Sequence, residues 1–209
     1  MRMTPMIETI ENAVQLGVAL ILAIASLGIT YRKKSKAYGT LALFYAAIAL
    51  GDLYWLLYLG FYHVTPQYSY ISEVAWYAAW LFLLLFLRQV QGERLLDRHP
   101  ALWLIPVFTG AMCVFYMRWG DHVGNLISAV FMTLLLWRAL PGCFMKENGG
   151  VKRWFSIAVV AFCLVEYIMW TLSCFFDGDT LANPYLWFDP LYTVCIALIF
   201  PALGKAVRE

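Results

Sequence analysis

Seven long apolar stretches follow one another along the chain, separated by short segments that contain most of the charged residues. Within each stretch the apolar residues are continuous, without the two-residue alternation of a membrane β-strand. About 20 residues of helix cross a hydrocarbon core about 30 Å thick. The pattern therefore predicts an all-α, polytopic membrane protein with seven transmembrane helices, at residues 10–31, 38–62, 69–90, 100–117, 121–140, 154–176 and 187–204.

The composition agrees with a chain that lies almost entirely in lipid. Of the 209 residues, 63% are hydrophobic and 13% are charged, whereas soluble domains contain about 25% charged residues. We therefore expect residues 1–209 to form a single transmembrane domain of the cell membrane, with the lipid bilayer as a partner. A net charge of +2 is too small to indicate a nucleic-acid partner.

The basic residues predict the orientation of the helices. Threading the chain through seven spans places 13 of the 15 Lys and Arg residues on one side, and only Arg2 and Arg118 on the other. Cytoplasmic loops carry the excess of Lys and Arg, so we expect the N-terminus outside and the C-terminus in the cytoplasm. Only Arg118 to Gly120 separate the fourth stretch from the fifth, which allows either a tight hairpin or a re-entrant pair.

Acidic residues recur at matching places in the two halves of the chain. Asp52 lies within the second apolar stretch and Glu73 opens the third. In the same way, Glu166 lies within the sixth stretch and Asp189 opens the seventh. This recurrence indicates an internal duplication, which is common among membrane transport proteins.

A weaker match, between Gln15 and Asn125, extends the duplication to the first and fifth stretches. The predicted repeats are residues 10–90 and 121–204, joined by a linker helix at 100–117. Since a single linker helix lies between them, both triplets would begin outside and end inside, as parallel repeats.

This layout of three, one and three helices resembles the SWEET, PQ-loop and nicotinamide-riboside type of seven-helix transporter. The resemblance covers the whole chain but concerns topology alone, because the Pro66-Gln67 dipeptide lies in an outer loop and not within a helix. It implies the same orientation and a solute bound between the two triplets. A rhodopsin has seven helices too, but the only lysine near the seventh stretch, Lys205, lies at its cytoplasmic end.

Asp52 and Glu166 are the clearest candidates for chemistry, because an ionisable group inside a bilayer costs about 2.5 to 3.5 kcal/mol. They can face a polar cavity that binds a solute or a proton. Alternatively, each can hydrogen-bond a neighbouring helix in its protonated form, or pair with a buried polar group such as Gln15 or Asn125.

Glu73 and Asp189 have two possible roles, helix capping and solute binding, since each is expected in the first turn of a helix. A carboxylate there can cap unpaired N–H groups, and Asp189 followed by Pro190 is typical of an N-cap with proline at the first helical position. Their matching places in the two repeats favour a second role in solute binding.

Aromatic residues follow these acids at helical spacing, so that rings and carboxylates share faces. Ring faces beside carboxylates are typical of sites for organic cations, so we expect a cationic or amine-bearing solute. The candidate rings are Trp55, Trp76, Trp80 and Trp170. Interfacial belts are the competing explanation for Trp residues in membrane proteins, and we assign Trp103, Trp119, Trp154 and Trp187 to them.

The first functional hypothesis is a small-solute transporter that binds a cation, or couples to protons, between the two triplets. The alternatives are a ligand-sensing receptor domain that acts through a partner, and an accessory subunit of a membrane complex; the sequence leaves oligomer formation open. No catalytic motif is present, and His63, His99 and His122 are too scattered for a metal site, so we expect neither an enzyme nor a cofactor.

Overall fold

The computed structural model describes residues 6–66, 70–91, 100–144, 151–176 and 178–206, and these residues are almost entirely helical. The elements are α1 (Met6–Lys33), α2 (Lys36–Tyr62), α3 (Tyr70–Gln91), a short 3₁₀ helix η1 (Pro100–Trp103), α4 (Leu104–Tyr116), α5 (His122–Phe144), α6 (Val151–Ser173) and α7 (Tyr185–Ala206). The all-α prediction is confirmed.

Six of these helices, α1, α2, α3, α5, α6 and α7, are long and apolar enough to cross a bilayer. The fourth predicted stretch is a shorter apolar helix, Pro100–Tyr116, whose first turn is 3₁₀. It is followed by a turn and then by the full-length α5, so the two segments form a hairpin. The protein is therefore a multi-pass helical membrane protein.

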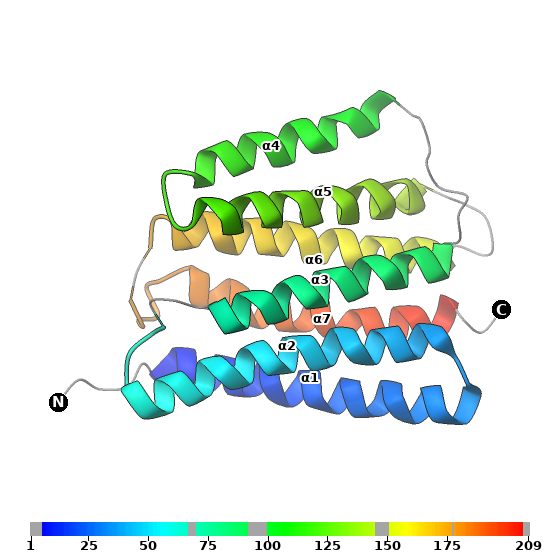
Figure 1. Ribbon diagram of the computed structural model, residues 1–209, viewed down its shortest axis with the longest axis horizontal. Helices are drawn as coiled ribbons and strands as arrows, with labels where there is room; N and C mark the ends of the chain where they lie inside the picture. Colours follow the sequence, from blue (N-terminus) through cyan, green and yellow to red (C-terminus); the bar gives the residue numbers. More distant parts are fainter. Residues whose placement is uncertain (1–5, 67–69, 92–99, 145–150, 177, 207–209) are drawn as a thin grey trace.

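The helices lie side by side and alternate in direction (Figure 1). Helices α1, α3, α5 and α7 all begin at one end of the bundle, which we call the α1-start end. The six long helices pack in the order α1, α2, α3, α5, α6 and α7, and α7 returns to contact α1. Helix α4 lies at the edge of the bundle and packs against α5.

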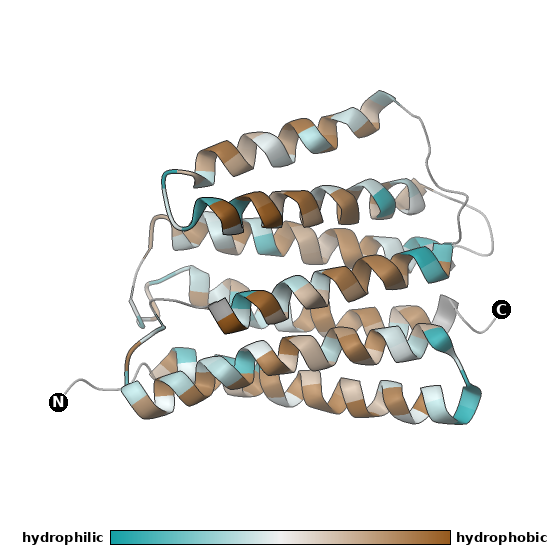
Figure 2. Ribbon diagram, in the orientation of Figure 1, coloured by the Kyte–Doolittle hydropathy of each residue, from teal (hydrophilic) through white to brown (hydrophobic). Residues whose placement is uncertain are grey.

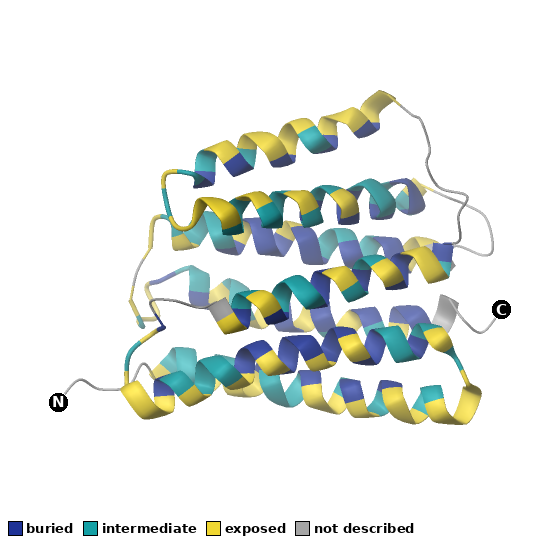
Figure 3. Cartoon of the chain, viewed as in Figure 1, coloured by how far each residue is buried: buried dark blue, intermediate teal, exposed yellow. Residues whose placement is uncertain are grey.

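The distribution of polar residues is that of a protein in lipid. Large apolar side chains such as Ile24, Val107 and Val194 are exposed on the outer faces of the helices, where brown hydrophobic segments in Figure 2 coincide with yellow exposed segments in Figure 3. In contrast, Asp52 and Glu166 are buried, with 0% and 7% of their surface exposed. Burial of acids beneath an apolar surface calls for a polar interior in the bundle.

Helix α7 begins earlier than the sequence predicts. The side chain of Asn183 accepts a hydrogen bond from the backbone N–H of Tyr185 at 3.0 Å, so Asn183 caps the helix. Pro190 lies inside α7, in its second turn. The interpretation of Asp189 as the N-cap is therefore wrong, and its side chain is available for another role.

Helix α1 is capped by a residue far away in the sequence. Asp179, in the loop before α7, accepts hydrogen bonds from the backbone N–H groups of Ile7 at 3.1 Å and Glu8 at 2.9 Å. Its carboxylate also lies at the positive end of the α1 dipole. The α6–α7 loop thereby holds the start of the first helix near the start of the last.

Replacing Asp179 with alanine is expected to lower the free energy of unfolding by about 1 kcal/mol, because two N–H groups lose their acceptor. For a chain of this size the melting temperature should fall by about 2 to 4 °C. Asp179→Asn, which keeps one oxygen acceptor, should lose less. Thermal unfolding in detergent measures both values, and equal losses for the two variants would contradict the capping role.

Candidate functional site

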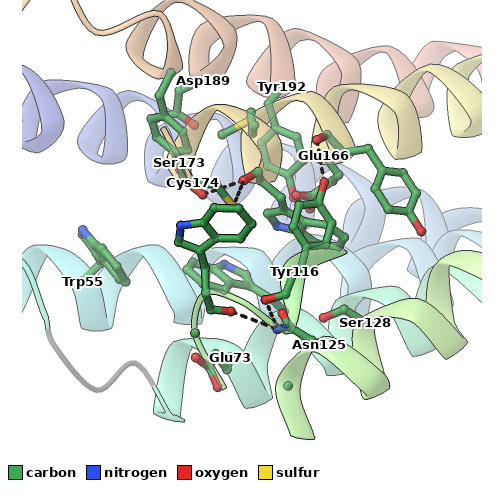
Figure 4. Close-up of a pocket in the computed structure, with 18 of the residues that line it drawn as sticks. Trp55, Glu73, Tyr116, Asn125, Ser128, Glu166, Ser173, Cys174, Asp189 and Tyr192 are labelled. Carbon is green, nitrogen blue, oxygen red and sulfur yellow. Dashed lines mark hydrogen bonds between the residues drawn. The ribbon is translucent and has the colours of Figure 1, made fainter. Parts of the chain in front are cut away.

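A cavity of about 890 Å³ lies within the bundle, lined by side chains from all seven helices. It extends from the loops at the α1-start end, where Asp121 and Asp179 line it, to Asp52 and Glu166 in the middle of α2 and α6. Its volume suits a small organic molecule with some water. Figure 4 shows the side chains that converge on this space.

The wall of the cavity is strongly acidic. Every Asp and Glu in the described part of the chain lines it, and no described Lys, Arg or His does. The eight carboxyl groups belong to Glu8, Glu11, Asp52, Glu73, Asp121, Glu166, Asp179 and Asp189. These groups spread along the cavity, since no three His, Cys, Asp or Glu side chains among the described residues come together as a metal site. Their summed field attracts positive charge.

Asp52 is held by a buried chain of hydrogen bonds that joins three helices. Gln15 of α1 donates to Oδ1 of Asp52 at 3.0 Å, and its own side-chain oxygen accepts from Thr193 of α7 at 3.0 Å. The amide of Gln15 serves both neighbours at once, as donor and acceptor. The second oxygen, Oδ2 of Asp52, has no hydrogen-bond partner although it is buried.

Glu166 occupies the matching place in α6. Its Oε1 accepts a hydrogen bond of 2.7 Å from the hydroxyl of Tyr192 in α7, and the Trp80 side chain of α3 is a second partner. Tyr192 and Thr193 are neighbours on α7, so this single helix contacts the arrangements around both Glu166 and Asp52. The two acids consequently lie at nearly the same depth, since successive helical residues rise by about 1.5 Å.

Aromatic rings line the same cavity as these acids. Trp55 and Trp76 lie with ring centres 5.9 Å apart, and Trp80 and Trp170 form an edge-to-face pair at 5.7 Å. Trp170 also contacts the ring of Tyr116 at 6.1 Å. All five rings line the cavity, so a cation inside it would meet aromatic surface as well as carboxylates.

Gly51 makes room for one of these rings. A Cβ atom at this position would lie 2.6 Å from Nε1 of Trp76. The absent side chain thus allows the Trp76 indole to lie against α2 at Gly51. The sequence shows Gly51 next to Asp52, but not which ring approaches it.

The outer part of the cavity contains acids that the sequence interpretation missed. Glu8 accepts hydrogen bonds from Nε1 of Trp55 at 2.7 Å and from the hydroxyl of Thr65 at 2.9 Å. Glu11 also lines the cavity, and its Oε2 has no hydrogen-bond partner. A signal was present, because residues 8, 11 and 15 fall on one face of the helix, just before a long apolar run.

The ten residues singled out from the sequence, from Gln15 to Asp189, all line this one cavity. Their role in solute binding stays a prediction. Gln15 does pair with Asp52, as one alternative stated. Asn125 does not pair with Glu166: it donates to the backbone carbonyls of Tyr116 and Trp119 and holds the turn between α4 and α5. Glu73 lies in the first turn of α3, as expected.

The tryptophans assigned to interfacial belts divide into two groups. Trp103, Trp154 and Trp187 are exposed on the outside of the bundle, as belt residues should be. Trp119 instead lines the cavity and packs against Phe115 and Phe175. Its assignment to the belt is therefore wrong; the turn between α4 and α5 directs it inward.

No protein-family model, curated protein or solved structure matches this chain.

Proposed function

We propose that this protein is a membrane transporter for a cationic or amine-bearing solute, which binds in the acidic cavity between the helices. One observation carries the proposal: all eight described carboxyl groups line a single aromatic-walled cavity that no described basic residue enters. Eight acids gathered in this way favour positive charge, and ring faces favour an ammonium group in particular.

We also propose that the bundle is built from two parallel triplets, α1–α3 and α5–α7, joined by α4, and that the chain crosses the membrane seven times with its N-terminus outside. The packing supports equivalence of the triplets: α1 packs on α2 and on α7, just as α5 packs on α6 and on α3. Asp52 and Glu166 then occupy corresponding helices. The distribution of Lys and Arg supports the orientation.

Transport would require relative movement of the two triplets around the bound solute. Single side-chain hydrogen bonds join the two triplets near the proposed solute site. In one of them, the hydroxyl of Thr193 donates to the side-chain oxygen of Gln15 at 3.0 Å. A cation that binds the carboxyl group of Asp52 would compete with Gln15 for it, and so disturb the hydrogen bonds from Thr193 through Gln15 to Asp52. Solute binding and the packing of α7 against α1 are therefore coupled in the proposed mechanism.

Ligand-induced thermal stabilisation tests the site. The purified protein would be titrated with tetramethylammonium, butylamine and a neutral sugar, because a ligand that binds only the folded state raises the melting temperature with concentration. The wild type should be stabilised by the two cations and not by the sugar. Glu166→Gln should lose most of this stabilisation, since it removes one negative charge at the inner end of the cavity.

The matched control is Glu147→Gln, the same loss of one carboxylate in the segment between α5 and α6. It should retain the wild-type response to both cations. Uptake of labelled butylamine into proteoliposomes then distinguishes transport from sensing. Binding without uptake would favour the receptor, and equal responses of wild type and Glu166→Gln would reject the cationic site.

A further inference from the structure

Four of the eight acids that line the cavity lie at two depths. The inner level contains Asp52 and Glu166, which Gln15 and Tyr192 hold by hydrogen bonds of 3.0 and 2.7 Å. Gln15 and Tyr192 belong to α1 and α7, two helices that run in the same direction and pack against each other. Positions along these two helices therefore measure depth in the cavity.

The outer level contains Glu11 and Asp189. Glu11 precedes Gln15 by four residues, so it lies about 6 Å nearer the α1-start end at 1.5 Å per residue. Asp189 precedes Tyr192 by three residues, which gives about 4.5 Å in the same direction. Both acids line the cavity, and Asp189 is close enough to interact electrostatically with Glu11, Asp52 and Glu166.

One carboxylate oxygen at each level has no protein partner. Among the buried side-chain atoms that the structure describes, the only carboxylate oxygens without a hydrogen bond are Oδ2 of Asp52 and Oε2 of Glu11. Asp52 itself is completely buried. Buried acceptors are nearly always satisfied in folded proteins, so these two indicate where a ligand donates hydrogen bonds.

Resting on the proposed function, we propose that the solute is a short linear diamine, with one ammonium group at Asp52 and Glu166 and the other at Glu11 and Asp189. A spacer of three or four carbons separates two ammonium nitrogens by about 5 to 6 Å in the extended form, from bonds of about 1.5 Å. This span equals the separation of the two levels. Two cations also match the four carboxyl groups of the two levels better than a single cation does.

The aromatic rings explain how the spacer is held. Trp76 packs on Trp55, Trp80 packs on Trp170, and all four rings line the cavity. The methylene groups of a diamine would pack between these rings while the ammonium groups reach the acids. A monoamine of equal length would fill the same apolar space, but the two acids of one level would then have no cation beside them.

The experiment compares butylamine, butane-1,4-diamine and octane-1,8-diamine, with dissociation constants measured by titration of the purified full-length protein. Butane-1,4-diamine is expected to bind about tenfold more tightly than butylamine, because its second ammonium adds charge-assisted hydrogen bonds. Octane-1,8-diamine should lose most of this advantage, since its nitrogens lie too far apart. In Glu11→Gln, the ratio between butylamine and butane-1,4-diamine should fall toward one.

Glu11 is only partly buried, so Glu11→Gln is expected to fold, and a monodisperse elution profile checks this. Similar affinities for butylamine and butane-1,4-diamine would overturn the diamine site and leave a cation site standing. A wild-type ratio unchanged by Glu11→Gln would also overturn it. If no amine binds at all, both the diamine site and the proposed function fail.

Discussion

Replacing Gln15 with leucine is expected to lower the free energy of unfolding by about 2 to 4 kcal/mol, because it leaves buried polar groups without partners. Asp52 would lose the donor to its Oδ1, and its Oδ2 already lacks one. Thr193 would lose its acceptor on α1. The melting temperature in detergent should fall by roughly 5 to 15 °C.

Asn12→Leu is the matched control for this variant. It makes the same exchange of an amide for an isobutyl group, three residues earlier on α1. The Asn12 side chain donates only within its own helix, to the carbonyl of Glu8 at 2.8 Å, so its loss should change the melting temperature little. Equal effects of the two substitutions would mean that the chain from Thr193 to Asp52 does not tie α1, α2 and α7 together.

The helices of this protein could be predicted from the sequence because lipid imposes a simple rule on the backbone. A segment without internal hydrogen bonds is too costly in hydrocarbon, so a long apolar run must be a helix. The first and last residues of each helix were harder to predict, since they depend on polar capping residues that this rule does not cover. Pro190 suggested a helix start, but Asn183 caps α7 earlier and the proline falls inside the second turn.

The inner part of the site could also be predicted, because a carboxylate in an apolar run stands out. Asp52, Glu166 and the rings at helical spacing were found this way, and they line one cavity. Asp179 was missed for a different reason. Its place depends on the closure of the bundle, which brings the α6–α7 loop to the start of α1. Nothing in the local sequence encodes that contact.

Helix α7 contacts several parts of the site. Asp189, Tyr192 and Thr193 are all on it, and they contact or face acids held by α1, α2 and α6. Tyr45 of α2 also donates to the backbone carbonyl of Ile196 at 3.0 Å, one turn further along α7.

Gly51→Ala is expected to weaken cation binding about tenfold and to destabilise the fold by about 1 to 3 kcal/mol, as overpacked sites usually do. The new methyl group would lie 2.6 Å from Nε1 of Trp76 and 3.1 Å from its Cδ1, so the indole must leave its place on α2. Its packing on Trp55 and its ring surface in the cavity wall would be lost with it. Thermal unfolding and butylamine titration measure the two effects.

Gly60→Ala provides the control, because it lies on the same helix and a Cβ there meets nothing within 4 Å. Alanine favours a helix over glycine by about 0.5 to 1 kcal/mol, so this variant should be slightly more stable and bind amines normally. Adding Trp76→Leu to Gly51→Ala should recover much of the lost stability, since the clash is removed, but none of the lost binding. Recovery of both would show that Trp76 fills space in the bundle without contacting the solute.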